Sequence, residues 1–209
     1  MTALYRFVEV THPTFNRSYT FTLNAGDIQQ LQLSSQSKKE TLIALVLGEI
    51  ISDNGKVEIA VDGAHWSAVD ATKFGQIAWV AGNGGLISNL KVWENITLPL
   101  WYHTAHEVLD TERQILDYLS LLGLEKEKCA DFMAAPPFTI EPWQRKLAGL
   151  LRAIMSKPLV LVVDASVFDD VKVQYLNCWI AALADYAAQG HAVLVIADRA
   201  TNLPWHKIE

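Results

Sequence analysis

Residues 33–40, LSSQSKKE, come nearest in this chain to a pattern that could bind phosphate. A short apolar run leads into a polar turn, and the turn opens a helix-like stretch with Lys39 near its start. In the pattern G-x-x-x-x-G-K-[ST], the glycines let backbone N–H groups wrap the phosphates, and the hydroxyl binds Mg²⁺. Here Leu33 and Lys38 stand at the glycine positions and Glu40 replaces the hydroxyl. The octapeptide alone therefore does not predict a phosphate loop.

Other residues offer little reactive chemistry. His103 and His106 are spaced i and i+3, as two metal ligands could be, but no third ligand is placed with them, so we expect exposed histidines. No Ser-His-Asp or Cys-His order with motif support occurs. Cys129 and Cys178 share no metal-type spacing, and we expect two reduced, buried thiols.

The composition is that of one folded domain. Of the 209 residues, 51% are hydrophobic, which is ample for a packed core. The net charge of -6 and the lack of a basic stripe argue against a nucleic-acid partner. Neither a signal peptide nor a membrane-spanning run is expected, which predicts a cytoplasmic location with any membrane role exercised through a partner.

Hydrophobic periodicity predicts β structure first and alternating helices and strands later. Strands at 4–11, 19–23 and 28–33 predict an antiparallel flank, because three β segments follow each other so early. The unbroken apolar runs ending at 164 and 197 are typical of parallel strands that are covered on both faces. The remaining elements are strands at 56–61 and 75–80, and helices at 39–47, 92–100, 107–122, 141–154 and 171–188. This order predicts an α/β fold.

Several of these segments resemble the nucleotide-binding domain of an ABC transporter, over nearly the whole chain. Residues 48–59, GEIISDNGKVEI, are similar to its segment G-L-x-x-P-x-x-G-x-V-x-I. Residues 86–100, LISNLKVWENITLPL, are similar to the segment that follows its Q-loop. Further matches are to the helix after the signature motif, the Walker B strand and the strand before the switch histidine, at residues 144–154, 159–164 and 192–197.

The resemblance implies a P-loop NTPase (ABC ATPase-like) core with an antiparallel β flank. It implies a single domain over residues 1–209, with a small helical subdomain at about 90–138. The segment VWENITLPL resembles that of the compact bacterial subgroup that includes lipid-trafficking (MlaF-like) and lipoprotein-release ATPases.

The positions that would carry the family's chemistry are substituted. The Q-loop glutamine falls on Gly82, the catalytic glutamate on Ala165 and the switch histidine on Asp198. The signature L-S-G-G-Q aligns with residues 140–144, IEPWQ, so that only its glutamine is kept. We therefore interpret the chain as an ABC domain homologue that keeps the scaffold and has lost the chemistry, with no catalytic residues and no metal site.

The candidate nucleotide-binding residues are Ser37, Lys39, Thr41 and Asp164, and we expect ATP and Mg²⁺ to bind weakly or not at all. Lys39 could retain some phosphate binding at a helix N-terminus, but we expect a surface lysine beside Lys38. Asp164 matches the Walker B aspartate, and we expect it to cap the next turn. A carboxylate at Glu40, about 4 Å from a phosphate charge, would cost on the order of 4 kcal/mol at an effective dielectric near ~20. Asp169 and Asp170 are expected to be a solvated pair.

We expect an accessory or regulatory subunit of a bacterial ABC transport system, acting through protein contacts. Its partners would be a membrane subunit, an active ATPase subunit or both, and it would reach the inner membrane only through them. Trp93 and Trp101 flank the segment that in this family receives the membrane subunit, and tryptophan is favoured at interface anchors. The alternatives are a nucleotide or phosphometabolite sensor without hydrolysis and, last, a working ATPase.

Overall fold

Two sheets organise the computed structural model, which describes residues 2–61, 65–70, 75–103 and 108–208. The antiparallel sheet contains, in spatial order, β2 (Tyr19–Asn24), β1 (Ala3–Thr11), β4 (Asn54–Ala60) and β5 (Trp66–Ala68). The parallel sheet contains, in spatial order, β6 (Ile77–Val80), β7 (Val160–Asp164), β8 (Ala192–Ala197), β3 (Ile28–Gln32) and β9 (His206–Ile208).

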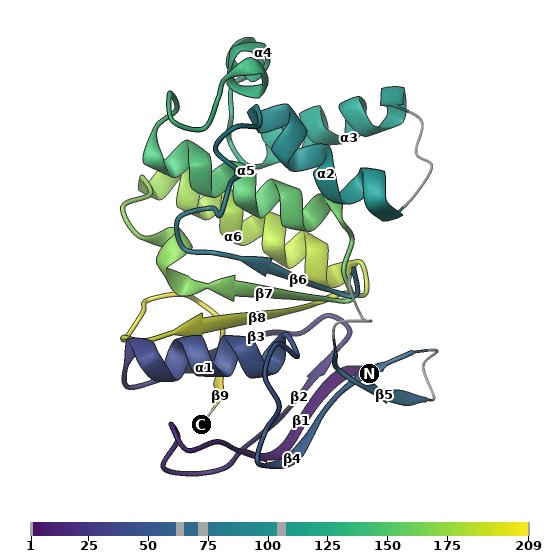
Figure 1. The fold of residues 1–209 in the computed structure, drawn as a ribbon. Helices are drawn as coiled ribbons and strands as arrows, with labels where there is room; N and C mark the ends of the chain where they lie inside the picture. The colour runs from purple at the N-terminus through teal and green to yellow at the C-terminus, as the bar shows by residue number, and fades with distance from the viewer. Residues whose placement is uncertain (1, 62–64, 71–74, 104–107, 209) are drawn as a thin grey trace.

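Helices cover both faces of the parallel sheet (Figure 1). On one face lies α1 (Gln36–Val46), together with the antiparallel sheet. The opposite face carries α5 (Pro142–Met155) and α6 (Val173–Ala188), and beyond them α2 (Val92–His103), α3 (Val108–Leu121) and α4 (Lys126–Ala134). The range predicted as a helical subdomain, about 90–138, contains these last three helices. Among the described residues, no helix has both the length and the apolar character needed to cross a bilayer.

The two central strands separate two hydrophobic cores. In β7, Val160 and Val162 pack toward α1 and the antiparallel sheet, whereas Leu161 and Val163 pack toward the helices on the other face. All four side chains are fully buried. Because successive side chains of a strand point to opposite faces, a strand between two cores must be apolar throughout. The expectation that these runs belong to a parallel sheet is confirmed.

The predicted α/β fold with an antiparallel flank is confirmed, but the place of one strand was wrong. β3 pairs in parallel with β8 and β9 instead of joining the antiparallel flank. The turn before it, where Asp27 Oδ2 accepts from the amide of Asn24 at 2.7 Å, carries the chain from one sheet into the other. Val61, predicted as the last residue of the strand at 56–61, lies beyond the end of β4 and is 52% exposed.

Candidate functional site

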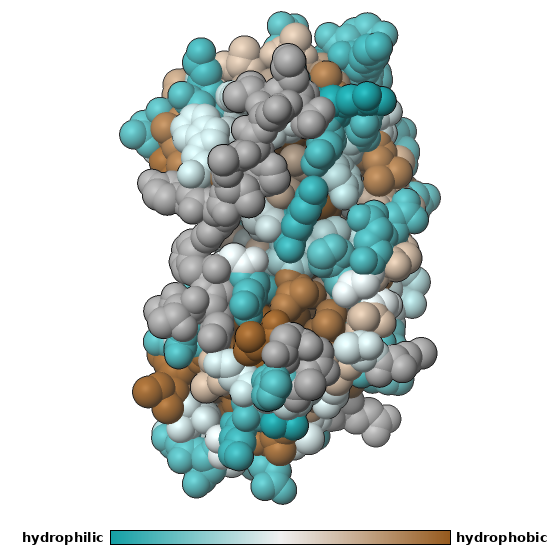
Figure 2. All heavy atoms as spheres, turned by 90° about the vertical axis from the view of Figure 1, so that its right-hand side faces the viewer, coloured by the Kyte–Doolittle hydropathy of each residue, from teal (hydrophilic) through white to brown (hydrophobic). Residues whose placement is uncertain are grey.

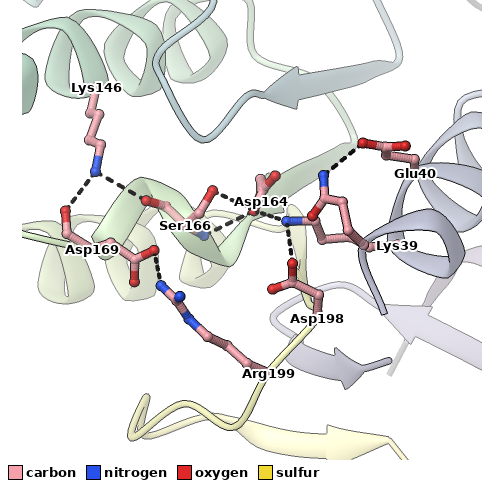
Figure 3. Close-up of polar contacts among 9 residues, drawn as sticks. Lys39, Glu40, Lys146, Asp164, Ser166, Asp169, Asp198 and Arg199 are labelled. Carbon is pink, nitrogen blue, oxygen red and sulfur yellow. Dashed lines mark hydrogen bonds and ion pairs between the residues drawn. The ribbon is translucent and has the colours of Figure 1, made fainter. Parts of the chain in front are cut away.

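The candidate site lies where the parallel strands end. The carboxyl ends of β3, β7 and β8 meet there, which is where open α/β sheets form their ligand crevices. A cavity of about 600 Å³ opens at this edge, and Lys39, Asp164 and Asp198 are among the residues that line it. Figure 3 shows the polar contacts that connect these side chains.

The turn before α1 is built as a helix cap. Leu33 is buried, and its amide donates to Ala197 O at 2.7 Å. Ser35 is the N-cap residue: its Oγ accepts from the amide of Lys38 at 3.4 Å, and its carbonyl accepts from the amide of Lys39 at 3.1 Å. The helix therefore begins at Gln36, before the predicted start at Lys39, because a serine cap satisfies its first amides. The amides of Lys38 and Lys39 are thus both bonded to Ser35.

Lys39 is buried, and the expectation of a surface lysine was wrong. Its side chain is 4% exposed. Its Nζ lies 3.1 Å from Asp164 Oδ1 and 3.4 Å from Asp198 Oδ2. Two carboxylates at the ends of β7 and β8 draw the ammonium inward, where its charge is paired. Lys38 keeps the outer position and reaches Asn16 Oδ1 at 3.5 Å.

Asp164 is held by more than the lysine. Its Oδ1 also accepts from the amide of Ser166 at 2.9 Å and from Ser166 Oγ at 2.8 Å. These bonds cap the short 3-10 helix Ala165–Phe168 that follows β7, so the expected capping role is confirmed. One oxygen of the Walker B aspartate is thus occupied by three protein donors.

Gly82 lies against the Ser166 side chain, which occupies the space that a Cβ at the Q-loop position would take. A Cβ on Gly82 would lie 1.8 Å from Ser166 Oγ and 3.1 Å from Ser166 Cβ. Ser166 therefore fills the space in which a glutamine at position 82 would begin. The hydroxyl could turn away only by giving up its bond to Asp164.

The other predicted binding residues lie apart from this cluster. Glu40 is exposed, and its Oε1 accepts from Gln36 Nε2 at 2.7 Å within the first turn of α1. Thr41 Oγ1 bonds to Thr14 Oγ1 at 3.4 Å, and Ser37 is exposed. Of the four candidates, the structure thus brings together only Lys39 and Asp164.

The cations around the cavity are engaged by protein groups. Lys146 Nζ donates to Ser166 O at 3.1 Å and to Asp169 O at 2.6 Å. Arg199 pairs with the Asp169 carboxylate, whose hydrogen bond and charge raise the pKa of the guanidinium. Asp170 is exposed. The expectation of a solvated aspartate pair therefore holds for Asp170 and not for Asp169. The lining holds as many carboxylates as cations: Asp164, Asp169, Asp170 and Asp198 against Lys39, Arg145, Lys146 and Arg199.

The residues at the signature position form a helix start. Pro142 is the first residue of α5, and Gln144 Oε1 accepts from the amide of Glu141 at 2.9 Å. The Trp143 ring stacks on Tyr175 with centroids 4.4 Å apart, and its Nε1 donates to Glu141 Oε2 at 2.6 Å. Proline in the first turn and this capping box are strong helix-initiating features.

A glycine contact fixes the loop at 81–85 against α5. Gly84 has a φ of +89°, and a Cβ on Gly149 of α5 would lie 2.2 Å from Gly84 O. Arg152 Nη1, one turn further along α5, donates to Gly85 O at 3.0 Å, and burial lowers the pKa of its guanidinium. The backbone of the loop at 81–85 and that of α5 are thus in direct contact.

Asn95 of α2 holds the next part of the chain. Its Oδ1 accepts from the amide of Ile87 at 2.7 Å. Its Nδ2 lies 3.0 Å from each of three carbonyl oxygens, those of Ile87, Leu90 and Lys91. The side chain is fully buried. One asparagine thus organises the segment between the Q-loop position and the helices.

The two tryptophans predicted at a partner interface lie on α2 in different surroundings. Trp93 is half-buried and lines a cavity together with α3 and α4. Trp101 is 65% exposed, two residues after Pro99. Pro99 lines a second, mainly apolar hollow, with Leu47, Ile77 and Trp79. Figure 2 shows this side of the molecule, where apolar atoms gather at mid-height.

Sequence reasoning missed the role of two residues in the site. Asp198 was interpreted only as a lost histidine, whereas it pairs with Lys39. Ser166 belongs to none of the segments that resemble the family's motifs. A usable signal existed, because an aspartate directly follows each of two unbroken apolar runs, and the ends of parallel strands meet at one edge of a sheet.

Metal binding finds no support in the described ranges. They contain no group of three or more His, Cys, Asp or Glu side chains placed to hold an ion. His106 of the predicted histidine pair lies outside these ranges.

The donor set that a phosphate loop supplies to Mg-ATP does not match this site. The lysine ammonium is paired with two carboxylates, position 40 offers no hydroxyl, and the amide of Lys38 is bonded to Ser35 Oγ. A triphosphate would also meet as much negative as positive charge around the cavity. The residues present thus do not fit the nucleotide and its metal ion.

Some known proteins have sequences similar to that of this chain. The chain is 25% identical over 190 residues to the "Probable ribonucleotide transport ATP-binding protein mkl" of Mycobacterium tuberculosis, covering 88% of this chain and 50% of that protein. It is 25% identical over 189 residues to the "Cytochrome c biogenesis ATP-binding export protein CcmA" of Escherichia coli, covering 90% and 84%. The chain thus spans about half the length of the mycobacterial relative. No protein-family model matches it.

Solved structures with the same fold are ABC cassettes. One is an ATP-binding subunit of an ABC transporter, with a TM-score of 0.77 and 16% identity over 93% of this chain and 79% of that one. Another is a dimeric ATP-binding cassette bound to ADP and Pi, with a TM-score of 0.73 and 18% identity over 94% and 88%. The resemblance to an ABC nucleotide-binding domain and the P-loop NTPase fold are confirmed.

Proposed function

We propose that this ABC-type domain acts in a transport system without hydrolysing ATP, as an accessory or regulatory subunit. One observation carries the proposal: the ammonium of Lys39, which a phosphate would need, is buried between Asp164 and Asp198. The capped turn before α1 and the missing hydroxyl at Glu40 support it independently.

The energetics favour the internal pairing over a nucleotide. A phosphate approaching Lys39 has to displace a carboxylate and then lie beside it. Two like charges about 4 Å apart cost on the order of 4 kcal/mol at an effective dielectric of ~20. A tenfold loss of affinity corresponds to only about 1.4 kcal/mol, so a carboxylate left this close to a phosphate opposes binding strongly.

The relatives support the transport role and differ in cargo. Their names speak of ribonucleotide transport and of export in cytochrome c biogenesis, and each calls its protein ATP-binding. We propose that this chain pairs with a membrane subunit, an active ATPase subunit or both, and works at the inner face of the membrane through them. The dimeric cassette supports a paired arrangement.

Calorimetry with Mg-ATP, combined with a turnover assay, tests the proposal. We expect no binding heat at 1 mM Mg-ATP and no phosphate release, with an intact ABC ATPase as the positive control. Clear binding without turnover would favour the nucleotide sensor instead. Turnover that disappears in Lys39→Ala would establish a working ATPase and refute the proposal.

Trp101 is expected to contact the membrane partner. Its side chain is 65% exposed on α2, and exposed aromatic side chains often anchor interfaces. Trp101→Ala should weaken capture of the co-expressed membrane subunit at least tenfold, and Trp93→Ala should also weaken it. Phe138→Ala, at a 75% exposed aromatic residue outside α2, is the matched control. Unchanged capture by Trp101→Ala would remove this residue from the interface.

A further inference from the structure

Three chain segments that end at the same edge of the parallel sheet are joined by one buried charge. Lys39 lies in the first turns of α1, Asp164 ends β7 and Asp198 follows β8. The Lys39 Nζ is within 3.4 Å of both carboxylates. Figure 3 shows the lysine between them.

Further hydrogen bonds extend this connection to two more segments. Ser166 donates to Asp164 Oδ1 and packs against Gly82, so the loop at 81–85 lies next to the same pair of residues. Lys146 reaches from α5 to the carbonyl of Ser166 at 3.1 Å. The site is thereby connected to the helix that begins at the signature position.

We propose that Lys39, Asp164 and Asp198 form a permanent internal ion cluster that takes the place of nucleotide in this domain. The cluster holds the strand ends, the loop at 81–85 and the start of α1 in one arrangement whether or not ATP is present. A partner protein therefore contacts the same surface in the presence and in the absence of ATP. This inference rests on the proposed function, since binding Mg-ATP through Lys39 would open the cluster.

Burial makes the cluster persistent. The side chains of Lys39 and Asp164 are 4% and 11% exposed, and that of Asp198 is 29% exposed. Salt screens such buried charges far less than surface pairs. Removing one partner leaves an uncompensated buried charge, which is more costly than the pair itself. The cluster also carries one more negative than positive charge, so it repels an incoming anion.

A double-mutant cycle between Lys39 and Asp198 tests the cluster. Lys39→Met leaves two carboxylates facing each other and should lower Tm by about 10 °C. Adding Asp198→Asn to it removes the like charge and should restore part of that loss, whereas a lysine that contributed only its apolar stem would give no rescue. Asp170→Asn, an exposed carboxylate on the same cavity, is the matched control and should stay within about 2 °C.

Hydrogen exchange supplies a second measurement if Lys39→Met does not fold. Asp198→Asn keeps the Lys39–Asp164 pair and is expected to fold, with faster amide exchange at 82–85 and 197–201 than in the unmodified chain. In the unmodified chain, 5 mM Mg-ATP should leave exchange at these segments unchanged.

The outcomes separate the cluster from the proposed function. If Lys39→Met matches Asp170→Asn in Tm, or if exchange is unaltered in Asp198→Asn, the cluster is refuted while the lack of ATP turnover stands. If Mg-ATP protects the unmodified chain at these segments, the cluster is refuted together with the absence of nucleotide binding.

Discussion

Replacing Gly149 by valine is expected to lower the free energy of unfolding by about 3 kcal/mol. The new Cβ would lie 2.2 Å from the carbonyl oxygen of Gly84, 2.7 Å from its Cα and 2.8 Å from its carbonyl carbon. These are backbone atoms and have no rotamer to escape into. The loop at 81–85 would have to move away from α5, and its bonds to Arg152 would break. Chemical denaturation followed by circular dichroism measures the loss.

Replacing Gly149 by alanine shows which of two opposing effects on stability is larger, the gain in helix propensity or the clash of the new Cβ. Alanine favours a helix interior over glycine by about 1 kcal/mol, but it brings the same Cβ into the same contact. We expect Gly149→Ala to be net destabilising, by about 1 to 2 kcal/mol. Gly190→Ala is the control, because it meets no atom within 4 Å and is strained only by its φ of +99°. A Gly149→Ala protein as stable as the unmodified chain would contradict the close contact.

Replacing Asn95 by aspartate is expected to cost about 3 kcal/mol or more at neutral pH. The amide nitrogen lies 3.0 Å from three carbonyl oxygens, and a carboxylate oxygen in its place would face all of them without a proton to share. The site is fully buried, so water cannot screen the repulsion. Thr97→Val, which removes a buried hydroxyl bonded to Trp93 O on the same helix, should cost only about 1 kcal/mol.

The pH dependence identifies the cause of this loss. Burial and the carbonyls raise the pKa of the introduced carboxyl above its unfolded value of about 3.9. The penalty is therefore complete above the folded pKa and shrinks as the pH falls through it, because the protonated group can donate to a carbonyl. The stability gap between Asn95→Asp and the unmodified chain should be smaller at pH 5 than at pH 8. An equal gap at both would point to a change in packing.

The elements that sequence predicted well are those whose environment is uniform along the chain. β7 and β8 lie between two apolar cores, so their unbroken Val and Leu runs reveal both their type and their parallel pairing. The helix at 141–154 was predicted from its periodicity and its first-turn proline, and α5 begins and ends within one residue of it. β3 was misplaced, because it follows directly on two predicted strands and its three glutamines give it no unbroken apolar run like those of β7 and β8. Its Gln30 is nonetheless buried, with Nε2 donating to Thr201 Oγ1 at 2.7 Å.

The site was less predictable because its contacts join distant parts of the chain. Lys39 resembles a solvated lysine when seen beside Lys38 and Glu40, and nothing local shows that two carboxylates surround it. Aligning Asp198 with a histidine predicted a loss, whereas the tertiary fold turns the same residue into a partner. Local patterns identify which side chains are present at a sheet edge, but their pairing depends on the order of the strands.

The fit of Ser166 against Gly82 has a consequence for how this domain can change in evolution. A Cβ at position 82 would overlap the serine hydroxyl at 1.8 Å, and that hydroxyl is bonded to Asp164. A side chain at 82 therefore requires the Ser166 hydroxyl to turn away and give up its bond to Asp164. A substitution at 82 is expected to be tolerated better together with Ser166→Ala than alone.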